Sequence, residues 1–277
     1  MAPYIEILGR QLPTYGLLAL VGMLLSGWFA EHQAVKHGEH PFYMIEMLLI
    51  ALIGTMIGGH LLYAITNLKH FGEWSIFTLF GGMVYFGGLY GGIAAGYWWV
   101  RRKKYRLALY ADISAMALPL FHTFGRIGCF FGGCCYGIPW EHGILYHSPE
   151  IPADQIVRRF PVQLLESALV FLLFLTLYFV FYRVTPKSSE KQKSRTNRFR
   201  GHLLELYLGS YSVIRFLDEF LRGDAIRGHL GPFSTSQWIS LVTLIGLVIV
   251  QMVRKNTTRR KQDGTESPQP VQADPDR

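Results

Sequence analysis

Two arginines lie inside long apolar stretches of the sequence, where a charged side chain is costly unless it faces a polar cavity or a partner. Arg126 stands in the segment HTFGRIGCFFGGCCYG and Arg215 in the segment YSVIRFLDEFLRGD. Glycines let the backbone approach a ligand closely, and the guanidinium fork matches the oxygens of a phosphate. These segments therefore predict the binding of an anionic phosphate. The glycines that surround the first arginine are Gly125, Gly128, Gly132, Gly133 and Gly137.

The second segment carries further polar residues at helical spacing. Intervals of four, four and three residues place their side chains on one face of a helix. Such a face can form a ladder of ion pairs that leaves one arginine for an anion, or a purely structural ladder that locks helices together. The residues of this face are Tyr211, Arg215, Glu219 and Arg222.

Other polar residues begin apolar stretches and should lie at the same depth as the two arginines. Tyr15 begins the first stretch, and Gln163 with Glu166 begins the fifth. Together they predict a cavity near the outer membrane surface that suits a phospholipid headgroup. The segment GGMVYFGGLYGG adds Gly87 and Gly88, which either line this cavity or let two helices pack tightly.

The apolar residues themselves are grouped into about seven stretches, each of roughly 18 residues or more, long enough as a helix to cross a hydrocarbon layer of about 30 Å. Polar faces do not recur along them, which argues against a soluble helical protein. We expect an all-α, polytopic membrane protein with one seven-helix domain over residues 1–260 and a disordered tail over 261–277. The stretches begin at Leu12, Phe42, Ile76, Leu107, Val162, His202 and Ser236.

The net charge of +8 is unevenly distributed along the chain. Most lysines and arginines fall in the segments that are internal if the N-terminus is outside, so the bias predicts an N-out, C-in orientation. Basic loops beside membrane spans are typical of topology signals, and we expect no nucleic-acid partner. The first residues lack a basic region and a cleavage site, so the first helix is expected to remain in the mature protein. The internal basic positions are Lys36, Arg101 to Arg106, Arg183 to Arg200 and the tail from Arg254.

The segment GRIGCFFGGCCYG resembles the signature of the bacterial prolipoprotein diacylglyceryl transferases, a family of membrane enzymes. The resemblance extends through TYGLLALVG, GGHLLYAI, GGMVYFGGLYGG, PVQLLES and YSVIRFLDEFLRGD, in order along nearly the whole chain. It implies a seven-helix enzyme of the bacterial cytoplasmic membrane. Such an enzyme moves the diacylglyceryl group of phosphatidylglycerol to the lipobox cysteine thiol of a prolipoprotein and releases glycerol phosphate, with no metal or other cofactor.

The same resemblance assigns roles to particular residues of this chain. It implies that Arg126 binds the phospholipid, that Gly137 closes the signature, and that Tyr15 is the tyrosine of the first helix. Arg215 and Glu219 match the pair of the sixth helix. Either arginine could stabilise the charge that develops on the departing phosphate.

The chain departs from the family at positions that matter for proton transfer. Phe86 stands where many members have a histidine before the paired glycines, and Phe160 replaces another histidine. Phenylalanine cannot accept a proton, so the base lies elsewhere or none is needed. Our candidate is His122, four residues before Arg126 on the same helical face and about 6 Å deeper. The alternative is a histidine that only forms hydrogen bonds between helices.

Cys129 is a further departure, since many members have asparagine there. With Cys134 and Cys135 it makes up all the cysteines of the chain. Zinc sites usually show CxxC or HxxxH spacing, which is absent here, so we predict no metal. Packing thiols are expected, with a disulfide between Cys129 and Cys134 as the alternative.

The sequence is also compatible with two other functions. The departures at Phe86 and Cys129 could mark a divergent paralogue that uses another acceptor or lipid. A lipid transporter that makes no bonds would be expected to show internal repeats, and none is found in the sequence.

Overall fold

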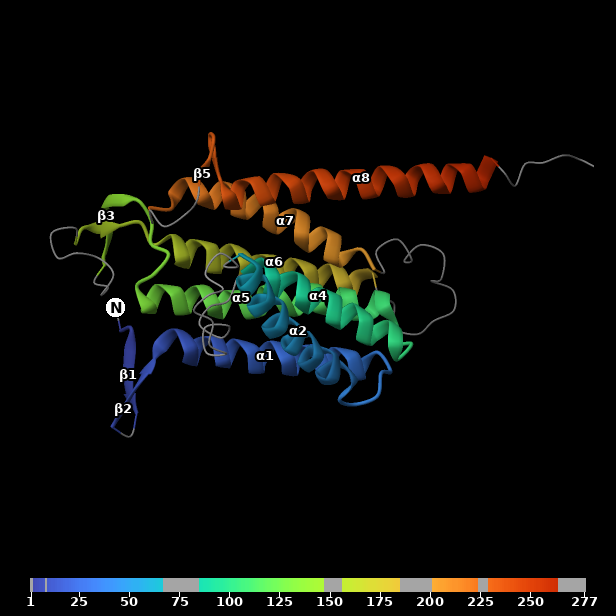
Figure 1. The fold of residues 1–277 in the computed structure, drawn as a ribbon, viewed down its shortest axis with the longest axis horizontal. Helices are drawn as coiled ribbons and strands as arrows, with labels where there is room; N and C mark the ends of the chain where they lie inside the picture. Colours follow the sequence, from blue (N-terminus) through green and yellow to red (C-terminus); the bar gives the residue numbers. More distant parts are fainter. Residues whose placement is uncertain are drawn as a thin grey trace, which may run out of the picture.

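The computed structural model describes residues 2–7, 9–66, 85–146, 156–184, 201–223 and 229–263. Its described part contains seven long α-helices, which run along a common bundle (Figure 1). The predicted helical fold is therefore confirmed, and each helix overlaps a predicted stretch. The helices are α1 (Thr14–Lys36), α2 (Tyr43–Thr66), α4 (Tyr85–Arg102), α5 (Leu107–Gly132), α6 (Val162–Val184), α7 (Leu203–Asp218) and α8 (Thr235–Asp263).

Five of these helices, α1, α2, α5, α6 and α8, are long and apolar enough to cross a membrane. The chain is thus a polytopic membrane protein. Helix α4 has 18 residues and α7 has 16, so the count of seven spans stays a prediction, as does the orientation. Residues 76–84 of the third predicted stretch lie outside the described residues. Helix α8 continues to Asp263, slightly beyond the predicted domain boundary.

Helix α5 forms the centre of the bundle. It contacts α1 on one side and α6 on the other, and it also contacts α7 (Figure 1). Ile113 and Met116 of α5 are fully buried, as are Ala34 of α1 and Leu177 of α6. The outward faces of α2 and α8 instead expose many large apolar side chains. Such a surface is stable in lipid, where exposed apolar groups incur no hydration cost.

Short strands cover one end of the bundle, which we call the β end. It carries the hairpin of β1 (Tyr4–Ile7) with β2 (Arg10–Pro13) and the pair of β3 (Pro139–Leu145) with β4 (Arg158–Arg159) (Figure 1). A third pair, β5 (His229–Leu230) with β6 (Phe233–Ser234), precedes α8. Helices α1 and α6 begin at the β end, and α5 ends there, so their polar residues are brought to one depth.

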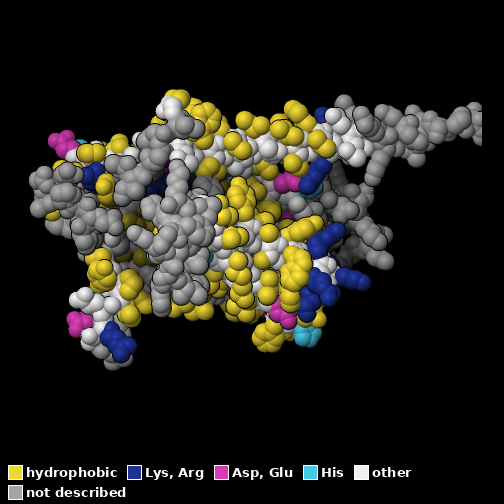
Figure 2. Space-filling model, in the orientation of Figure 1, with side chains coloured by type: hydrophobic (Ala, Val, Ile, Leu, Met, Phe, Trp, Pro, Cys, Tyr) yellow, Lys and Arg dark blue, Asp and Glu magenta, His cyan; other side chains and the backbone are white. Residues whose placement is uncertain are grey.

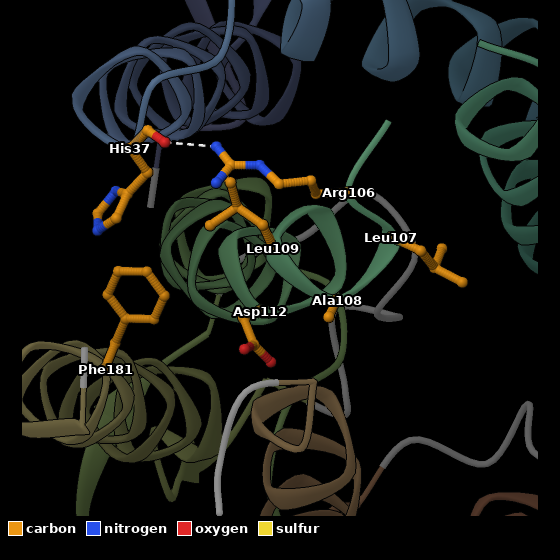
Figure 3. Close-up of a pocket in the computed structure, with 7 residues that line it drawn as sticks. All are labelled: His37, Arg106, Leu107, Ala108, Leu109, Asp112 and Phe181. Carbon is orange, nitrogen blue, oxygen red and sulfur yellow. Dashed lines mark hydrogen bonds between the residues drawn. The ribbon is translucent and has the colours of Figure 1, made fainter. Parts of the chain in front are cut away.

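The opposite end, which we call the basic end, is where α4 passes into α5. Lysine and arginine side chains gather there on the visible surface, while hydrophobic side chains cover the middle of the bundle (Figure 2). A cavity of about 340 Å³ lies at this end. None of the residues predicted for the lipid site lines it. Its lining residues, shown in Figure 3, are His37, Arg106, Leu107, Ala108, Leu109, Asp112 and Phe181.

Asp112 of this cavity caps the start of α7 from a neighbouring helix. One carboxylate oxygen accepts a hydrogen bond from the Gly201 N–H at 2.7 Å and the other from the Leu203 N–H at 3.1 Å. The first N–H groups of a helix have no partner within the helix, so a carboxylate from α5 satisfies them. Asp112 is itself only 2% exposed. It therefore fixes α7 against α5 at the basic end.

We expect Asp112→Ala to lower the free energy of unfolding by about 2 kcal/mol, because one buried and one partly buried backbone donor lose a charged acceptor. Unfolding in sodium dodecyl sulfate, followed by circular dichroism, measures this change. Glu141→Ala removes an exposed carboxylate from β3 and serves as the matched control, with an expected change within about 0.5 kcal/mol. Equal stability of the two variants would show that the cap is dispensable.

Candidate functional site

Arg126 and Glu166 form a buried ion pair between α5 and α6. Arg126 Nη2 lies 2.8 Å from both oxygens of the Glu166 carboxylate. The side chain of Glu166 is 1% exposed and that of Arg126 is 12% exposed. The Arg126 Nε–H is also buried, and no described residue accepts a hydrogen bond from it. A buried donor without an acceptor is rare in proteins, and a bound ligand or water is one explanation for it.

Glu166 is shared by two further side chains. His122 Nε2 lies 3.6 Å from its Oε1 atom, and the Tyr211 hydroxyl donates to the same oxygen at 3.3 Å. The rings of His122 and Tyr211 meet edge to face with centroids 4.9 Å apart. The predicted proximity of His122 to Arg126 is thus seen, and Glu166 is the group that connects them. Three helices, α5, α6 and α7, supply these four residues.

Arg215 makes a second group of ion pairs near the end of α7. It lies 3.2 Å from Asp218, 2.9 Å from Glu219 and 3.1 Å from the Ser236 hydroxyl. The predicted pairing of Arg215 with Glu219 at four residues' spacing is confirmed. Glu219 opens a single 3-10 turn, Glu219–Leu221, that continues α7.

Asp218 was missed by the sequence analysis. Its side chain is 1% exposed, and besides Arg215 it interacts with the Glu166 carboxyl. The two arginine groups therefore form one polar cluster. The spacing of Arg215 and Asp218 could have predicted their pairing, since an acid three residues after an arginine lies on the same side of a helix. The cluster comprises His122, Arg126, Glu166, Tyr211, Arg215, Asp218 and Glu219.

Gln163 lies outside this cluster and supports the loop that follows α5. Its side-chain oxygen accepts a hydrogen bond from the Tyr146 hydroxyl at 2.7 Å, and its amide nitrogen donates to the Cys134 carbonyl at 2.7 Å. Burial raises the pKa of Tyr146 to about 12, so this hydroxyl stays protonated and acts as a donor. Gln163 is 1% exposed. Both of its polar groups are thus used within the protein, and a contact with substrate remains a prediction.

Tyr15 lies beside the last turns of α5. It is 48% exposed at the start of α1 and packs against Gly128 and Gly132 of α5. A side chain at Gly128 would approach the Tyr15 ring to 3.1 Å. Gly128 thus allows this tyrosine to lie near Arg126, as the predicted cavity requires.

Gly137 lies where three chain segments cross. A Cβ atom there would be 2.3 Å from the Phe160 carbonyl oxygen and 3.0 Å from that of Leu221. Gly137 also forms a β-bridge with Arg222. Its role is therefore to let the segments before α6 and after α7 close over the end of α5.

Gly87 and Gly88 pack against α2. A Cβ atom at Gly87 would lie 2.2 Å from the Gly58 carbonyl oxygen, and one at Gly88 would lie 3.1 Å from Thr55 Cγ2. This close contact of α2 and α4 accounts for both glycines by tight helix packing. Their contact with phospholipid remains a prediction, and the side chain of Phe86 lies outside the described residues.

Comparison with known proteins gives the same family throughout. The sequence profile described as prolipoprotein diacylglyceryl transferase matches residues 3–253. A phosphatidylglycerol–prolipoprotein diacylglyceryl transferase of Clostridium tetani is 32% identical over 245 residues, which cover 87% of this chain and 92% of that protein. The enzyme numbered 2 in Clostridium perfringens is 30% identical, with 92% and 96% covered. One from Geobacter sulfurreducens is 32% identical, with 87% and 90% covered. The chain belongs to the prolipoprotein diacylglyceryl transferase family.

Proposed function

We propose that the protein transfers the diacylglyceryl group of phosphatidylglycerol to the lipobox cysteine thiol of prolipoproteins and releases glycerol phosphate. Relatives named for phosphatidylglycerol and prolipoprotein cover most of the chain and support this activity. The observation that carries the proposal is the buried Arg126, whose Nε–H has no acceptor among the described residues. A phosphate oxygen is the acceptor that an arginine fork suits best.

The reaction exchanges one bond to carbon for another. The sulfur of the acceptor cysteine forms a bond to the glyceryl carbon, and the bond from that carbon to the phosphate oxygen breaks. The electron pair leaves with the phosphate, and the thiol proton passes to a base. Arg126 stabilises the departing phosphate, because a fixed positive group in a site that excludes water acts strongly on developing charge.

The electrostatic balance of the polar cluster fits this role. The positive charges of two arginines, Arg126 and Arg215, face three carboxylates. Neither arginine is therefore buried without a negative partner when lipid is absent. The carboxylates belong to Glu166, Asp218 and Glu219. An incoming phosphate competes with Glu166 for Arg126. This competition weakens headgroup binding and favours release of the product phosphate.

The charges at the basic end support an N-out, C-in orientation. The lysines and arginines of Arg101 to Arg106 lie where α4 passes into α5, at the basic end, and the positive-inside rule favours the cytoplasm for this end. The β end and the polar cluster then face the outer leaflet of the bacterial cytoplasmic membrane.

His122 is the proposed proton acceptor. Its ring is held by Glu166 and Tyr211 one helical turn before Arg126, and 24% of its side chain is exposed. We expect His122→Gln to lower kcat/KM by about 100-fold, the lower range for loss of a general base. His142→Gln changes an imidazole in β3 and is the matched control, with activity expected to be unchanged. Full activity of a well-folded His122→Gln variant would exclude the base role and leave the histidine a structural group.

The activity itself is tested by a gel-shift assay with purified protein, a lipobox peptide and either phosphatidylglycerol or phosphatidylethanolamine. We expect a shifted peptide with phosphatidylglycerol and no shift when the peptide cysteine is replaced by alanine. Movement of lipid between leaflets without any shift would instead identify a transporter. A shift with phosphatidylethanolamine alone would identify a divergent paralogue.

A further inference from the structure

Three thiols converge at the β end of α5, beside the polar cluster. The Sγ atoms of Cys129, Cys134 and Cys135 all lie within 4.8 Å of one another. All three are free thiols, and Cys129 is buried. The proposed reaction does not use them, because its nucleophile comes from the prolipoprotein. The spacing of these cysteines did not predict a metal site, whereas their positions in the fold bring three sulfur ligands together.

The turn that ends α5 produces this convergence. Gly133 adopts a left-handed conformation with φ of 74°, and its N–H bonds to the Phe130 carbonyl at 3.2 Å. The Cys134 N–H bonds back to the Cys129 carbonyl, also at 3.2 Å. This pair of bonds is a Schellman motif, which folds the chain back over the last helical turn. Cys135 then adopts a φ of 58°, a conformation that costs energy for a residue with a side chain.

We propose that Cys129, Cys134 and Cys135 form a binding site for one thiophilic metal ion of the Cu⁺ or Zn²⁺ class. Soft thiolate ligands select these ions. With a metal–sulfur distance of about 2.3 Å, three sulfurs around one ion would lie about 4 Å apart. The observed limit of 4.8 Å admits this geometry with small side-chain rotations.

A neighbouring helix also supports the turn that carries the three thiols. The Gln163 amide, which donates to the Cys134 carbonyl, fixes the turn from α6. The site is thus supported by a backbone motif and by a side chain of another element.

A bound ion would also protect the enzyme from its own reaction, a consequence that rests on the proposed function. The reaction forms a thioether from a thiol and phosphatidylglycerol, and a thioether on the enzyme would not be reversed by the same chemistry. Cys129 lies one helical turn after Arg126, the residue that is proposed to hold the lipid phosphate. Sulfur lone pairs that bind a metal are not free to attack the glyceryl carbon.

The test uses the full-length protein, reduced and purified in detergent, without lipid or peptide. It is titrated with Cu⁺ under anaerobic conditions, and separately with Zn²⁺ or its spectroscopic probe Co²⁺. We expect one ion per chain, thiolate-to-metal charge-transfer absorption, and protection of all three thiols from maleimide. With the free ion at 100 times its dissociation constant, alkylation should slow by about 100-fold, because only the unbound fraction reacts.

Two variants control for binding elsewhere and for folding. Replacing all three cysteines by serine should abolish charge-transfer absorption, and His142→Ala, which removes an imidazole from β3, should leave it unchanged. Because the protection experiment uses the wild-type protein, it remains decisive even if the triple variant does not fold. Unprotected thiols with both ions would overturn the proposal, as would isolation of the protein with a disulfide among these cysteines. Neither result depends on transferase activity, so failure of the metal site and failure of the proposed function are separable.

Discussion

Arg126→Ala is expected to lower the rate of diacylglyceryl transfer by about 100- to 1000-fold, the range for loss of a fixed group that stabilises developing charge. The variant loses the proposed phosphate ligand and the stabilisation of the departing glycerol phosphate. It also leaves the Glu166 carboxylate buried without its arginine, which lowers stability. The transfer rate is measured with phosphatidylglycerol and a lipobox peptide.

Arg126→Lys separates the two effects. Lysine keeps a positive charge beside Glu166, so the protein should fold, but it cannot offer the planar fork that suits phosphate. We expect it to retain stability and to lose most of the activity. Arg10→Ala removes an exposed arginine from β2 and is the matched control, with full activity expected. Wild-type rates in a folded Arg126→Ala protein would remove Arg126 from the mechanism.

Gly137→Ala is expected to destabilise the protein by about 3 kcal/mol or more, because the new Cβ atom would lie 2.3 Å from the Phe160 carbonyl oxygen. The same Cβ atom would lie 3.0 Å from the Leu221 carbonyl oxygen. Both neighbours are backbone atoms, so the backbone itself must move to make room for the methyl group. Loss of this crossing would also displace the end of α7. Unfolding in sodium dodecyl sulfate and the yield of folded protein measure the effect.

Gly246→Ala provides the matched control for this substitution. Gly246 lies in α8 with no heavy atom within 4 Å of a Cβ at its position, and alanine favours a helix over glycine. Its stability should equal or slightly exceed that of the wild type. If Gly137→Ala were as stable as this control, the close crossing at the β end would not exist in the protein.

The helices could be predicted from the sequence because apolar runs in a membrane protein have sharp ends. Predicted starts at Leu107 and Val162 coincide with those of α5 and α6, and the predicted start at His202 precedes α7 by one residue. Polar and charged residues mark both ends of each apolar run, so the presence of each helix can be predicted from the composition of the run. The depth of Arg126 and Glu166 followed from the same boundaries and a fixed rise per residue.

Partners between helices could not be predicted in the same way. The contact of Glu166 with phospholipid stays a prediction, and its pairing with Arg126 and Tyr211 was not predicted, because it depends on α5, α6 and α7 meeting at that depth. Gly87 lies against α2. A glycine-rich face can pack closely against the backbone of any helix, and the sequence does not identify which helix that is. Asp218 was overlooked for the same reason, as its link to Glu166 exists only once α6 and α7 pack together.

The three cysteines show what sequence patterns for metal ligands, such as CxxC, do not detect. A search for CxxC patterns assumes that ligands come from a short loop, whereas here a Schellman turn returns Cys134 and Cys135 to the last turn of α5. The left-handed conformation of Gly133 makes that return possible. A sequence rule that joins a helix end to a following glycine would have found the cluster.

The central claim is that one protein makes a thioether from a membrane lipid and a peptide thiol at the site of Arg126. Its most direct test is mass spectrometry of the products after incubation with phosphatidylglycerol and a lipobox peptide. The account predicts one diacylglyceryl group on the peptide cysteine and one glycerol phosphate released per modified peptide, with both products formed about 100- to 1000-fold more slowly by Arg126→Ala. Free diacylglycerol with an unmodified peptide, or equal product from the folded Arg126→Ala variant, would contradict it.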